Sequence, residues 1–292
     1  MKQYGKNKKN ISVMKIVLGS CLILYTVSLF LPFIWTLVTS LRGQMDIALN
    51  GYFNIPREIT FSHYENAWWE FEIQVATATG SRKVYIEEMF FNTIIYSIST
   101  ALVGALSPCI VAYLCAKYPY RFGRFIYALV VVLMLIPVVG NMPSMILVLK
   151  TLGINDTLIA QIFMAGHFAN TYFLIFYSTF KGLPAGYAEA ARIDGASDTC
   201  IMFQIMFPLI KTSISIVFLL LFIARWNNYI DPMMYYPSHP TIGLGLNLYT
   251  QQGNTLPQML AASMIVITPI LILFLIFKKY LMGNLTMGGL KG

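Results

Sequence analysis

The sequence predicts an all-α polytopic membrane protein with six transmembrane helices and a cytoplasmic helical element between the fourth and the fifth. Of its 292 residues, 57% are hydrophobic and 11% are charged, whereas a soluble domain carries roughly 25% charged residues. Several apolar runs reach the length of about 20 residues that a helix needs to cross the hydrocarbon core. Basic residues gather beside alternate runs, which is typical of loops that stay in the cytoplasm.

Six apolar segments are predicted to cross the membrane: Met14–Thr39, Phe90–Ala116, Arg124–Val148, Ile159–Phe180, Phe207–Trp226 and Met259–Phe277. The first is too long for the apolar region of a signal peptide and lacks an A-x-A cleavage site, so we expect it to be retained. The third contains Pro137, Gly140 and Pro143, which predict a kink or a broken turn. Neighbouring helices can satisfy the backbone groups freed there.

These segments divide the chain into five parts. They are a cytoplasmic N-terminus (1–13), a first transmembrane helix (14–39), an extracellular loop (40–88), a transmembrane domain with helices 2–6 (89–281) and a cytoplasmic tail (282–292).

The distribution of charge predicts the orientation. Most of the 20 basic residues lie beside the ends that we assign to the cytoplasm: Lys2, Lys6, Lys8, Lys9, Lys15, Lys117, Arg121, Arg124, Lys181, Arg192, Lys211, Lys278, Lys279 and Lys291. The first outside loop carries acids instead: Asp46, Glu58, Glu65, Glu70, Glu72, Glu87 and Glu88. Both termini are therefore predicted to be cytoplasmic, and the net charge of +8 indicates topology and no nucleic-acid partner.

Motifs for catalysis or metal binding are absent from the sequence. It contains no G-x-x-x-x-G-K-[ST], no H-E-x-x-H and no G-x-S-x-G, which argues against an ATPase or a membrane protease. Its three histidines are far apart, and its four cysteines form no CxxC pair. We therefore predict no catalytic residue, no metal site and no cofactor bound by this chain.

One polar stretch lies between two long apolar runs, at residues 184–208. Pro184 suits the first turn of a helix, and Ala185–Asp194 is rich in alanine, the best helix former. Gly195 stands where a left-handed residue ends a helix, and Ser197 or Asp198 can cap a second helix. The stretch is therefore predicted to form a helix–turn–helix element at the membrane surface.

The two helices of this element are predicted to have different surfaces. The second has four apolar residues at helical spacing on one face: Met202, Ile205, Met206 and Leu209. In the first, small residues (Ala188, Ala190, Ala191 and Gly195) would allow another protein's backbone to come close. Glu189, Arg192 and Asp194 supply polar contacts at the edges. A solvated loop that contains a helix remains the alternative.

The strings EAARIDGAS (residues 189–197) and IMFPLI (205–210) resemble the EAA loop of ABC importer permeases, especially those of the carbohydrate-uptake type. The match falls on Glu189, Ala190, Ala191, Gly195, Ile205 and Pro208, with Phe207 where leucine is commoner. Further strings resemble the same family in order: NIPREITFSHYENAW, FFNTIIYS, ARWNNYIDP and the tail GGLKG. The tail is similar to that of the maltose-type second permease subunit, so the resemblance covers nearly the whole chain.

The resemblance implies a multi-pass permease of the bacterial cell membrane, with a cytoplasmic EAA coupling helix between helices 4 and 5. Six residues would couple it to an ATPase: Glu189, Ala190, Ala191, Arg192, Asp194 and Gly195. Gly289 and Lys291 of the tail would also contact that ATPase. Its partners would be a second (maltose-type first) permease subunit, a cytoplasmic ABC ATPase dimer that uses ATP and Mg, and an extracellular solute-binding protein.

Polar side chains in the predicted spans are candidates for the sugar path, because such groups usually face a cavity or another helix. They are Asn141, His167, Asn170, Tyr172, Trp226, Asn227 and Asn228. Trp226 beside Asn227 offers the aromatic face and the amide that a sugar site uses, although interhelical hydrogen bonds remain an alternative. The segment 231–255 resembles the loop that reaches into the binding protein in sugar importers.

Two other functions remain open on the sequence. A permease for a non-sugar solute shares the EAA loop. A secondary transporter would show internal repeats and ionisable residues in the middle of its helices, where this chain has only His167.

Overall fold

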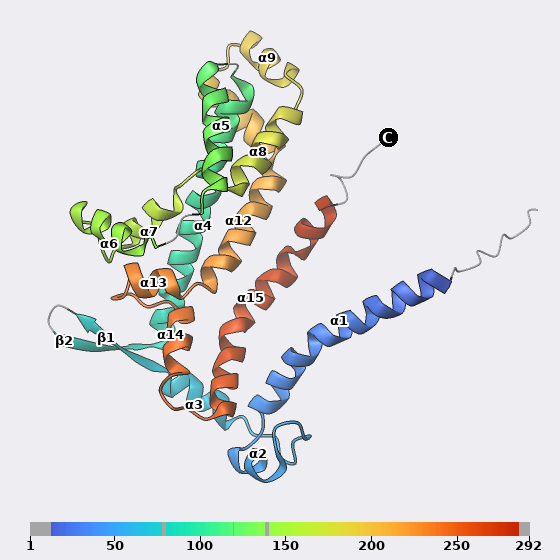
Figure 1. The fold of residues 1–292 in the computed structure, drawn as a ribbon, viewed down its shortest axis with the longest axis vertical. Coiled ribbons are helices and arrows are strands. Elements are labelled where there is room, and N and C mark those ends of the chain that lie inside the picture. Colours follow the sequence, from blue (N-terminus) through green and yellow to red (C-terminus); the bar gives the residue numbers. More distant parts are fainter. Residues whose placement is uncertain (1–12, 78–79, 119, 138–139, 286–292) are drawn as a thin grey trace, which may run out of the picture. The chain divides into compact units, whose positions relative to one another are not determined.

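The computed structural model describes residues 13–77, 80–118, 120–137 and 140–285, and this part of the chain is mainly helical (Figure 1). It forms two compact units. The first contains the described residues up to Glu70 together with Asn254–Ile265, and the second contains Phe71–Gly253 and the described residues from Val266 onward. Helix α15 (Leu256–Leu285) contributes to both units.

The first unit begins with the first predicted span. Its helices are α1 (Val13–Ser40), α2 (Gln44–Asn50), α3 (Ser62–Glu70) and the first turns of α15. Helix α1 agrees with the predicted Met14–Thr39 and is long and apolar enough to cross a bilayer.

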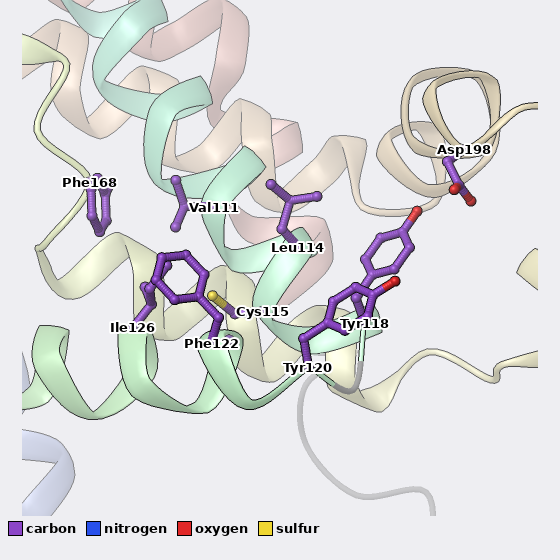
Figure 2. Close-up of a pocket in the computed structure, with 10 residues that line it drawn as sticks. Val111, Leu114, Cys115, Tyr118, Tyr120, Phe122, Ile126, Phe168 and Asp198 are labelled. Carbon is purple, nitrogen blue, oxygen red and sulfur yellow. The ribbon is translucent and has the colours of Figure 1, made fainter.

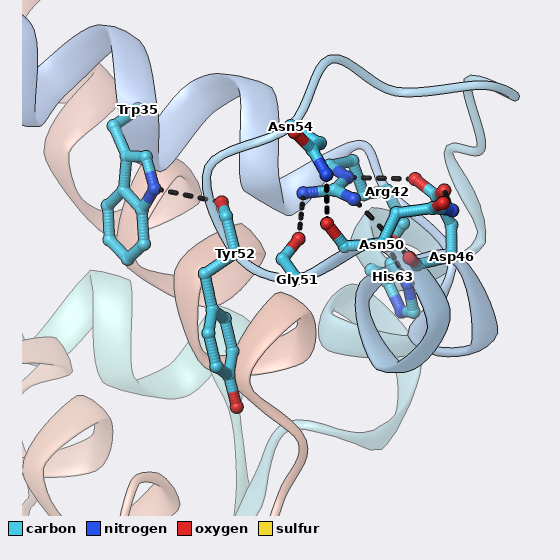
Figure 3. A network of polar contacts seen from close by, with 8 residues as sticks. All are labelled: Trp35, Arg42, Asp46, Asn50, Gly51, Tyr52, Asn54 and His63. Atoms are coloured by element: carbon cyan, nitrogen blue, oxygen red, sulfur yellow. Dashed lines mark hydrogen bonds and ion pairs between the residues drawn. The ribbon is translucent and has the colours of Figure 1, made fainter.

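A buried arginine organises the loop after α1 (Figure 3). The guanidinium of Arg42, which has no exposed surface, donates to Asp46 Oδ2 at 2.8 Å and to the Gly51 carbonyl oxygen at 2.8 Å. Asp46 Oδ1 accepts from Asn50 Nδ2 at 2.6 Å, and His63 Nε2 lies 3.0 Å from the Arg42 carbonyl oxygen. A buried charge is costly unless it is paired and hydrogen-bonded. These contacts therefore fix the path of the chain between α1 and α3.

Helix α4 is the central element of the second unit. It runs over Ile86–Lys117 and packs against α5, α7, α8, α12 and α14. Small residues line its buried side, among them Ala101, Gly104 and Ala105. A Cβ added at Gly104 would lie only 3.2 Å from Leu221 Cδ1 of α12 (Lys211–Trp226). Small residues let helices approach closely in this way, as they do in membrane interiors.

The third predicted span is divided into two helices, α5 (Arg121–Leu135) and α6 (Met142–Thr151). The segment between them contains Pro137 and Gly140, and Gly140 adopts a φ of 73°. Pro143 lies in the first turn of α6, where proline is tolerated. The predicted break is confirmed.

The fourth predicted span is also divided, which the sequence analysis missed. Helix α7 covers Leu158–Ala165, and α8 covers Thr171–Gly182. The side chain of Asn170 caps α8 by accepting from the backbone N–H groups of Tyr172 and Phe173. The prediction of one continuous helix over Ile159–Phe180 was therefore wrong, because an asparagine cap begins a new helix inside it.

The fifth predicted span, Phe207–Trp226, contains a bend near its start. The helical segment of α10 (Asp198–Cys200), the π-helix η1 (Ile201–Met206) and α11 (Phe207–Leu209) meets α12 at an angle of 76°. In the part of the chain that the structure describes, three helices are long and apolar enough to cross a membrane: α1, α4 and α15. The bent pair would make a fourth. The first, second and sixth predicted segments are thus single helices.

A β-hairpin lies within the predicted outer loop, where the all-α prediction had no strand. Strand β1 (Glu72–Thr77) pairs antiparallel with β2 (Gly80–Tyr85). Ile73, Val75 and Val84 are buried and point to one face, as alternation along a strand requires.

The hairpin and the segment after α12 lie toward the same end of α4, and helix α9 (Gly186–Ile193) lies at the other end (Figure 1). That segment contains α13 (Ile230–Tyr235) and α14 (Ile242–Tyr249). The Ile242 backbone N–H donates to Thr93 Oγ1 at 2.7 Å, and Asn92 Nδ2 donates to the Pro240 carbonyl oxygen at 3.1 Å. These contacts hold the segment against the first turns of α4.

Candidate functional site: the α9 element

Helix α9 ends in a left-handed turn at Gly195, as predicted. Gly195 has a φ of 81°, and its N–H donates to the Arg192 carbonyl oxygen at 3.0 Å. The N–H of Ala196 donates to the Ala191 carbonyl oxygen at 2.9 Å. These two bonds form a Schellman motif, which satisfies carbonyl groups at the end of a helix. The turn therefore has a defined geometry.

One face of α9 packs onto an aromatic cluster of its own chain. Ala188 and Ala191 are buried in the core that contains Tyr113, Phe180 and Phe207. The ring centroids of Tyr113 and Phe180 are 5.3 Å apart, and those of Phe180 and Phe207 are 6.1 Å apart. The small size of the two alanines lets the helix backbone approach these rings. Their side chains support α9 from within, and contact of Ala191 with an ATPase stays a prediction.

The opposite face of α9 is exposed. It carries Glu189, Ala190 and Asp194, which sequence analysis had selected, and also Tyr187 and Ile193. Tyr187 is 50% exposed and Ile193 is 87% exposed. Sequence analysis missed both, although their separation from the buried Ala188 and Ala191 along the helix would have revealed them. We call Tyr187, Glu189, Ala190, Ile193 and Asp194 the outer face of α9.

An ion pair joins the two helices of the element across the turn. Arg192 Nη2 lies 3.1 Å from Asp198 Oδ1, and both side chains are half exposed or more. The Arg192 guanidinium also lies over the ring of Tyr118, 5.7 Å from its centroid. The Tyr118 hydroxyl points toward the Asp198 carboxylate (Figure 2). The element therefore contacts the residue that follows the last turn of α4.

A cavity of about 590 Å³ lies beside these side chains (Figure 2). Its wall is mainly apolar and includes Val111, Leu114, Phe122, Ile126 and Phe168. Tyr118, Tyr120 and Asp198 form its polar end.

The second helix of the element differs from the prediction. Ser197 caps it, since its hydroxyl accepts from the Cys200 N–H at 3.3 Å. The buried residues are Ile201, Met206, Phe207 and Ile210, whereas Leu209 is 45% exposed. The predicted apolar face over Met202, Ile205, Met206 and Leu209 was therefore wrong at its end. The reason is the π-helix, whose i→i+5 hydrogen bonds widen each turn and change which residues share a face.

Two of the candidates for the sugar path lie at the break between α7 and α8. Asn170 uses its side-chain oxygen for the cap of α8 and donates from Nδ2 to the His167 carbonyl oxygen at 3.0 Å. The His167 ring is exposed, and its Nδ1 lies 2.8 Å from the Met164 carbonyl oxygen. Asn141 is exposed at the start of α6, and Tyr172 is half-buried in the first turn of α8. Contact with a solute stays a prediction for each of them.

The remaining three candidates lie at the end of α12. Trp226 is buried, and its Nε1 lies 3.4 Å from the Val266 carbonyl oxygen. Asn227 Nδ2 donates to a carbonyl one turn earlier in α12 at 2.9 Å. Asn228 Oδ1 accepts from two backbone N–H groups at the start of α13, including that of Asp231 at 3.1 Å. The structure thus brings them together at one helix end and uses their polar groups for local bonds.

An ion pair that sequence analysis missed lies beside them. Arg225 Nη1 and Asp231 Oδ2 are 2.8 Å apart, and Asn228 Nδ2 donates to the same oxygen at 2.7 Å. Both charged side chains are half-buried. The sequence signal for this ion pair is an arginine just before the end of α12 and an aspartate just after it. Gly289 and Lys291, predicted to contact the ATPase, lie outside the described residues. No group of three metal-binding side chains occurs within the described parts of the chain.

Comparison with known proteins identifies a family. Residues 108–285 match the family described as "Binding-protein-dependent transport system inner membrane component". The matched region begins inside α4 and includes α9 and α12.

Individual relatives match over most of their length. The arabinooligosaccharides transport system permease protein AraQ of Halalkalibacterium halodurans is 30% identical, over 89% of this chain and 91% of that protein. The melibiose/raffinose/stachyose import permease protein MelC of Bacillus subtilis is 27% identical, over 90% and 92%. The diacetylchitobiose uptake system permease protein NgcG of Streptomyces coelicolor is 26% identical, over 91% and 86%.

A solved structure has a similar fold. A chain in the crystal structure of a bacterial ABC transporter that imports the acidic polysaccharide alginate matches with a TM-score of 0.72 and 20% identity. The match covers 96% of this chain and 99% of that chain.

Proposed function

Since this chain belongs to the family of binding-protein-dependent transport system inner membrane components, we propose that it is a permease subunit of an ABC importer for an oligosaccharide. The three relatives named above transport di- or oligosaccharides by their names, and each aligns with this chain over more than four fifths of both lengths. The chain would form the membrane path together with a second permease subunit. An extracellular solute-binding protein would deliver the sugar.

The outer face of α9 is the observation that carries the mechanism. It exposes an acidic residue (Glu189) beside a hydrophobic one (Ile193) at the end of α4 opposite the hairpin. Tyr187 and Ile193 add hydrophobic surface to this face, on a helix that a buried aromatic cluster supports. We propose that this face docks on a cytoplasmic ATPase, which binds ATP and Mg and supplies the force for transport. This chain would have no ATPase site of its own.

Six crossings of the bilayer fit this function and the distribution of basic residues. The breaks in the third and fourth spans are compatible with crossing, since irregular backbone is tolerated in a membrane where protein or a water-filled cavity surrounds it. With six crossings, both termini and the α9 element face the cytoplasm, and the hairpin with α13 and α14 faces outward.

Reconstitution tests the proposal. The purified chain alone should hydrolyse no ATP. Together with an ABC ATPase dimer, a second permease and a sugar-loaded binding protein, the complex should hydrolyse ATP and move the sugar into liposomes. ATP hydrolysis by the chain alone, or a complete complex that moves a non-sugar solute but no sugar, would contradict the proposal.

A charge reversal tests the docking face. Glu189→Lys should lower co-purification of the ATPase and sugar uptake at least tenfold. It would put a positive charge in the first turn of α9, where an acidic residue contributes about 0.3–1 kcal/mol. Glu87→Lys is the matched control: Glu87 is also exposed in the first turn of a helix, but at the opposite end of α4. Equal effects of the two substitutions would argue against docking through α9.

A further inference from the structure

The ATPase-driven motion must pass from α9 into the helices of the second unit, and α4 contacts more of them than any other helix. In sequence, the helices α5, α6, α7 and α8 separate α9 from the end of α4. In space, the α9 element meets the end of α4 at Tyr118. This residue directly follows the last residue of α4, Lys117.

Tyr118 has three kinds of contact at this place. Its ring carries the Arg192 guanidinium at 5.7 Å from the centroid, a cation–π arrangement. Its hydroxyl points toward Asp198, the partner of Arg192. Its ring also stacks on Tyr120 at 6.1 Å with an interplanar angle of 5°, and meets Tyr113 of α4 edge-on at 6.0 Å.

The cavity beside Tyr118 limits the number of contacts that hold this side chain. Tyr118, Tyr120 and Asp198 all border the space of about 590 Å³, so on that side no described residue of this chain packs against them. Tyr118 is connected to the element by the Arg192 guanidinium above its ring and by its hydroxyl, which points toward Asp198. The rings of Tyr113 and Tyr120 hold Tyr118 on the side of α4. Asp198 starts α10, and Arg192 lies in the last turn of α9, so both helices of the element are engaged.

We infer that Tyr118 is a positioning residue that locks the α9 element to the end of α4 and passes the ATPase-driven movement of that element into α4. The inference rests on the proposed function and deepens it, because it names the residue through which docking would be coupled to transport. Tyr118 is turned away from the outer face of α9 and toward the element's own ion pair.

The test separates ATP hydrolysis from transport in the complete complex. Tyr118→Leu removes both the aromatic face and the hydroxyl, and Tyr118→Phe removes the hydroxyl alone. With Tyr118→Leu, ATPase co-purification should stay within twofold of the unsubstituted complex, while the number of sugar molecules moved per ATP should fall at least tenfold. Tyr118→Phe should have a smaller effect, since the ring beneath Arg192 remains. Phe122→Leu is the matched control, because the Phe122 ring borders the same cavity but, among the described ring and cation contacts, meets Phe125 and neither Tyr118 nor Arg192.

A double substitution identifies the partner. In the Tyr118→Leu background, Arg192→Gln should lower the transport ratio no further, whereas alone it should lower it as much as Tyr118→Leu does. Independent losses that multiply would overturn the inference. So would an unchanged ratio, or a parallel loss of ATPase binding and transport in both Tyr118 variants. A complete unsubstituted complex that hydrolyses no ATP would instead refute the proposed function itself.

Discussion

Gly195 carries the backbone conformation that ends α9 and directs the chain into α10. Its φ of 81° is costly for a residue with a Cβ, and a Cβ there would meet no other atom within 4 Å. Any penalty for a side chain at this position is therefore conformational and amounts to about 1 kcal/mol. A β-branched residue is disfavoured further, whereas asparagine tolerates this region.

The first prediction compares two substitutions at this position. Gly195→Val should distort the turn, separate Arg192 from Asp198 and lower sugar uptake at least fivefold, because the outer face of α9 would lose its orientation. Gly195→Asn, similar in size, should keep most of the uptake. The measurement is uptake into liposomes at equal amounts of reconstituted complex, and equal loss in both variants would mean that added volume matters rather than φ.

The second prediction concerns Asp46. Hydrogen bonds from Arg42, above all, and from Asn50 lower the pKa of Asp46 below its usual value of 3.8. A carboxylate with a lowered pKa in the folded state contributes stability that is fully present above the unfolded value, about 3.9, and is lost as the pH falls through the folded value. Protection of the backbone amides between α1 and α3 from hydrogen exchange, corrected for the intrinsic exchange rate at each pH, should therefore stay constant from pH 6 to about pH 4 and decline below it.

Asp46→Asn provides the control for the pH dependence. It keeps the shape of the side chain but removes its charge, which leaves the buried Arg42 without a counter-ion. At pH 6 the amides of this loop should be less protected in the variant than in the unsubstituted chain, and their corrected protection should change little further toward acid. The same acid-dependent decline in both proteins would show that another group is responsible.

At the level of single elements, the sequence predicts best where one residue type dictates the backbone. Pro137 with Gly140 marks the break between α5 and α6, and Gly195 marks the end of α9. The break before α8 depends on an asparagine cap, and the high hydropathy of the surrounding residues predicts a continuous helix there. The π-helix of η1 has no residue signature of its own, although its buried residues Ile201 and Met206 belong to the core that contains the aromatic cluster. The alternation of Ile73 and Val75 with polar residues is a signal for strand β1, but such a short alternation is weak beside the long apolar spans.

The third prediction concerns the outer face of α9. Burying one isoleucine side chain against a partner contributes about 1.5–3 kcal/mol, and 1.4 kcal/mol corresponds to about a tenfold change in affinity. Ile193→Glu should therefore weaken co-purification of the ATPase about tenfold or more. Ile55→Glu is the control, since Ile55 is 86% exposed in the predicted outer loop and Ile193 is 87% exposed. A loss of ATPase binding with Ile55→Glu as well would indicate general misfolding.

For the whole molecule, the sequence predicts the membrane class and the family resemblance, and the comparisons confirm both. The sequence could not show whether each span is one helix or two, because the apolar composition of a span does not reveal a break within it, such as that before α8 at Asn170. It also could not separate the polar residues that bind solute from those that cap helices. Asn170 and Asn228 show the difficulty, because an amide in an apolar run serves either purpose and only the neighbouring backbone N–H groups reveal which.

The fourth prediction tests the topology. In a variant without the native cysteines, a cysteine at Trp69 should react with a membrane-impermeant thiol reagent added to intact cells, and one at Ala185 should not. The second should react once the membrane is opened, which controls for its accessibility. Labelling at position 185 in intact cells would reverse the proposed orientation.

The length of α4 has a mechanical consequence. At about 1.5 Å per residue, its 32 residues extend over about 48 Å, whereas the hydrocarbon core is about 30 Å thick. In the proposed topology, both ends of α4 would lie in water or among headgroups, with Glu87 and Glu88 at one end and Lys117 at the other. The distance between the two ends of α4 is then set by the length and stiffness of the helix and depends little on the thickness of the bilayer. Pro108 lies inside α4 and removes one of its backbone hydrogen bonds, so the helix bends most easily there. A force applied at Lys117 would therefore bend α4 at Pro108 before it moved the Glu87 end.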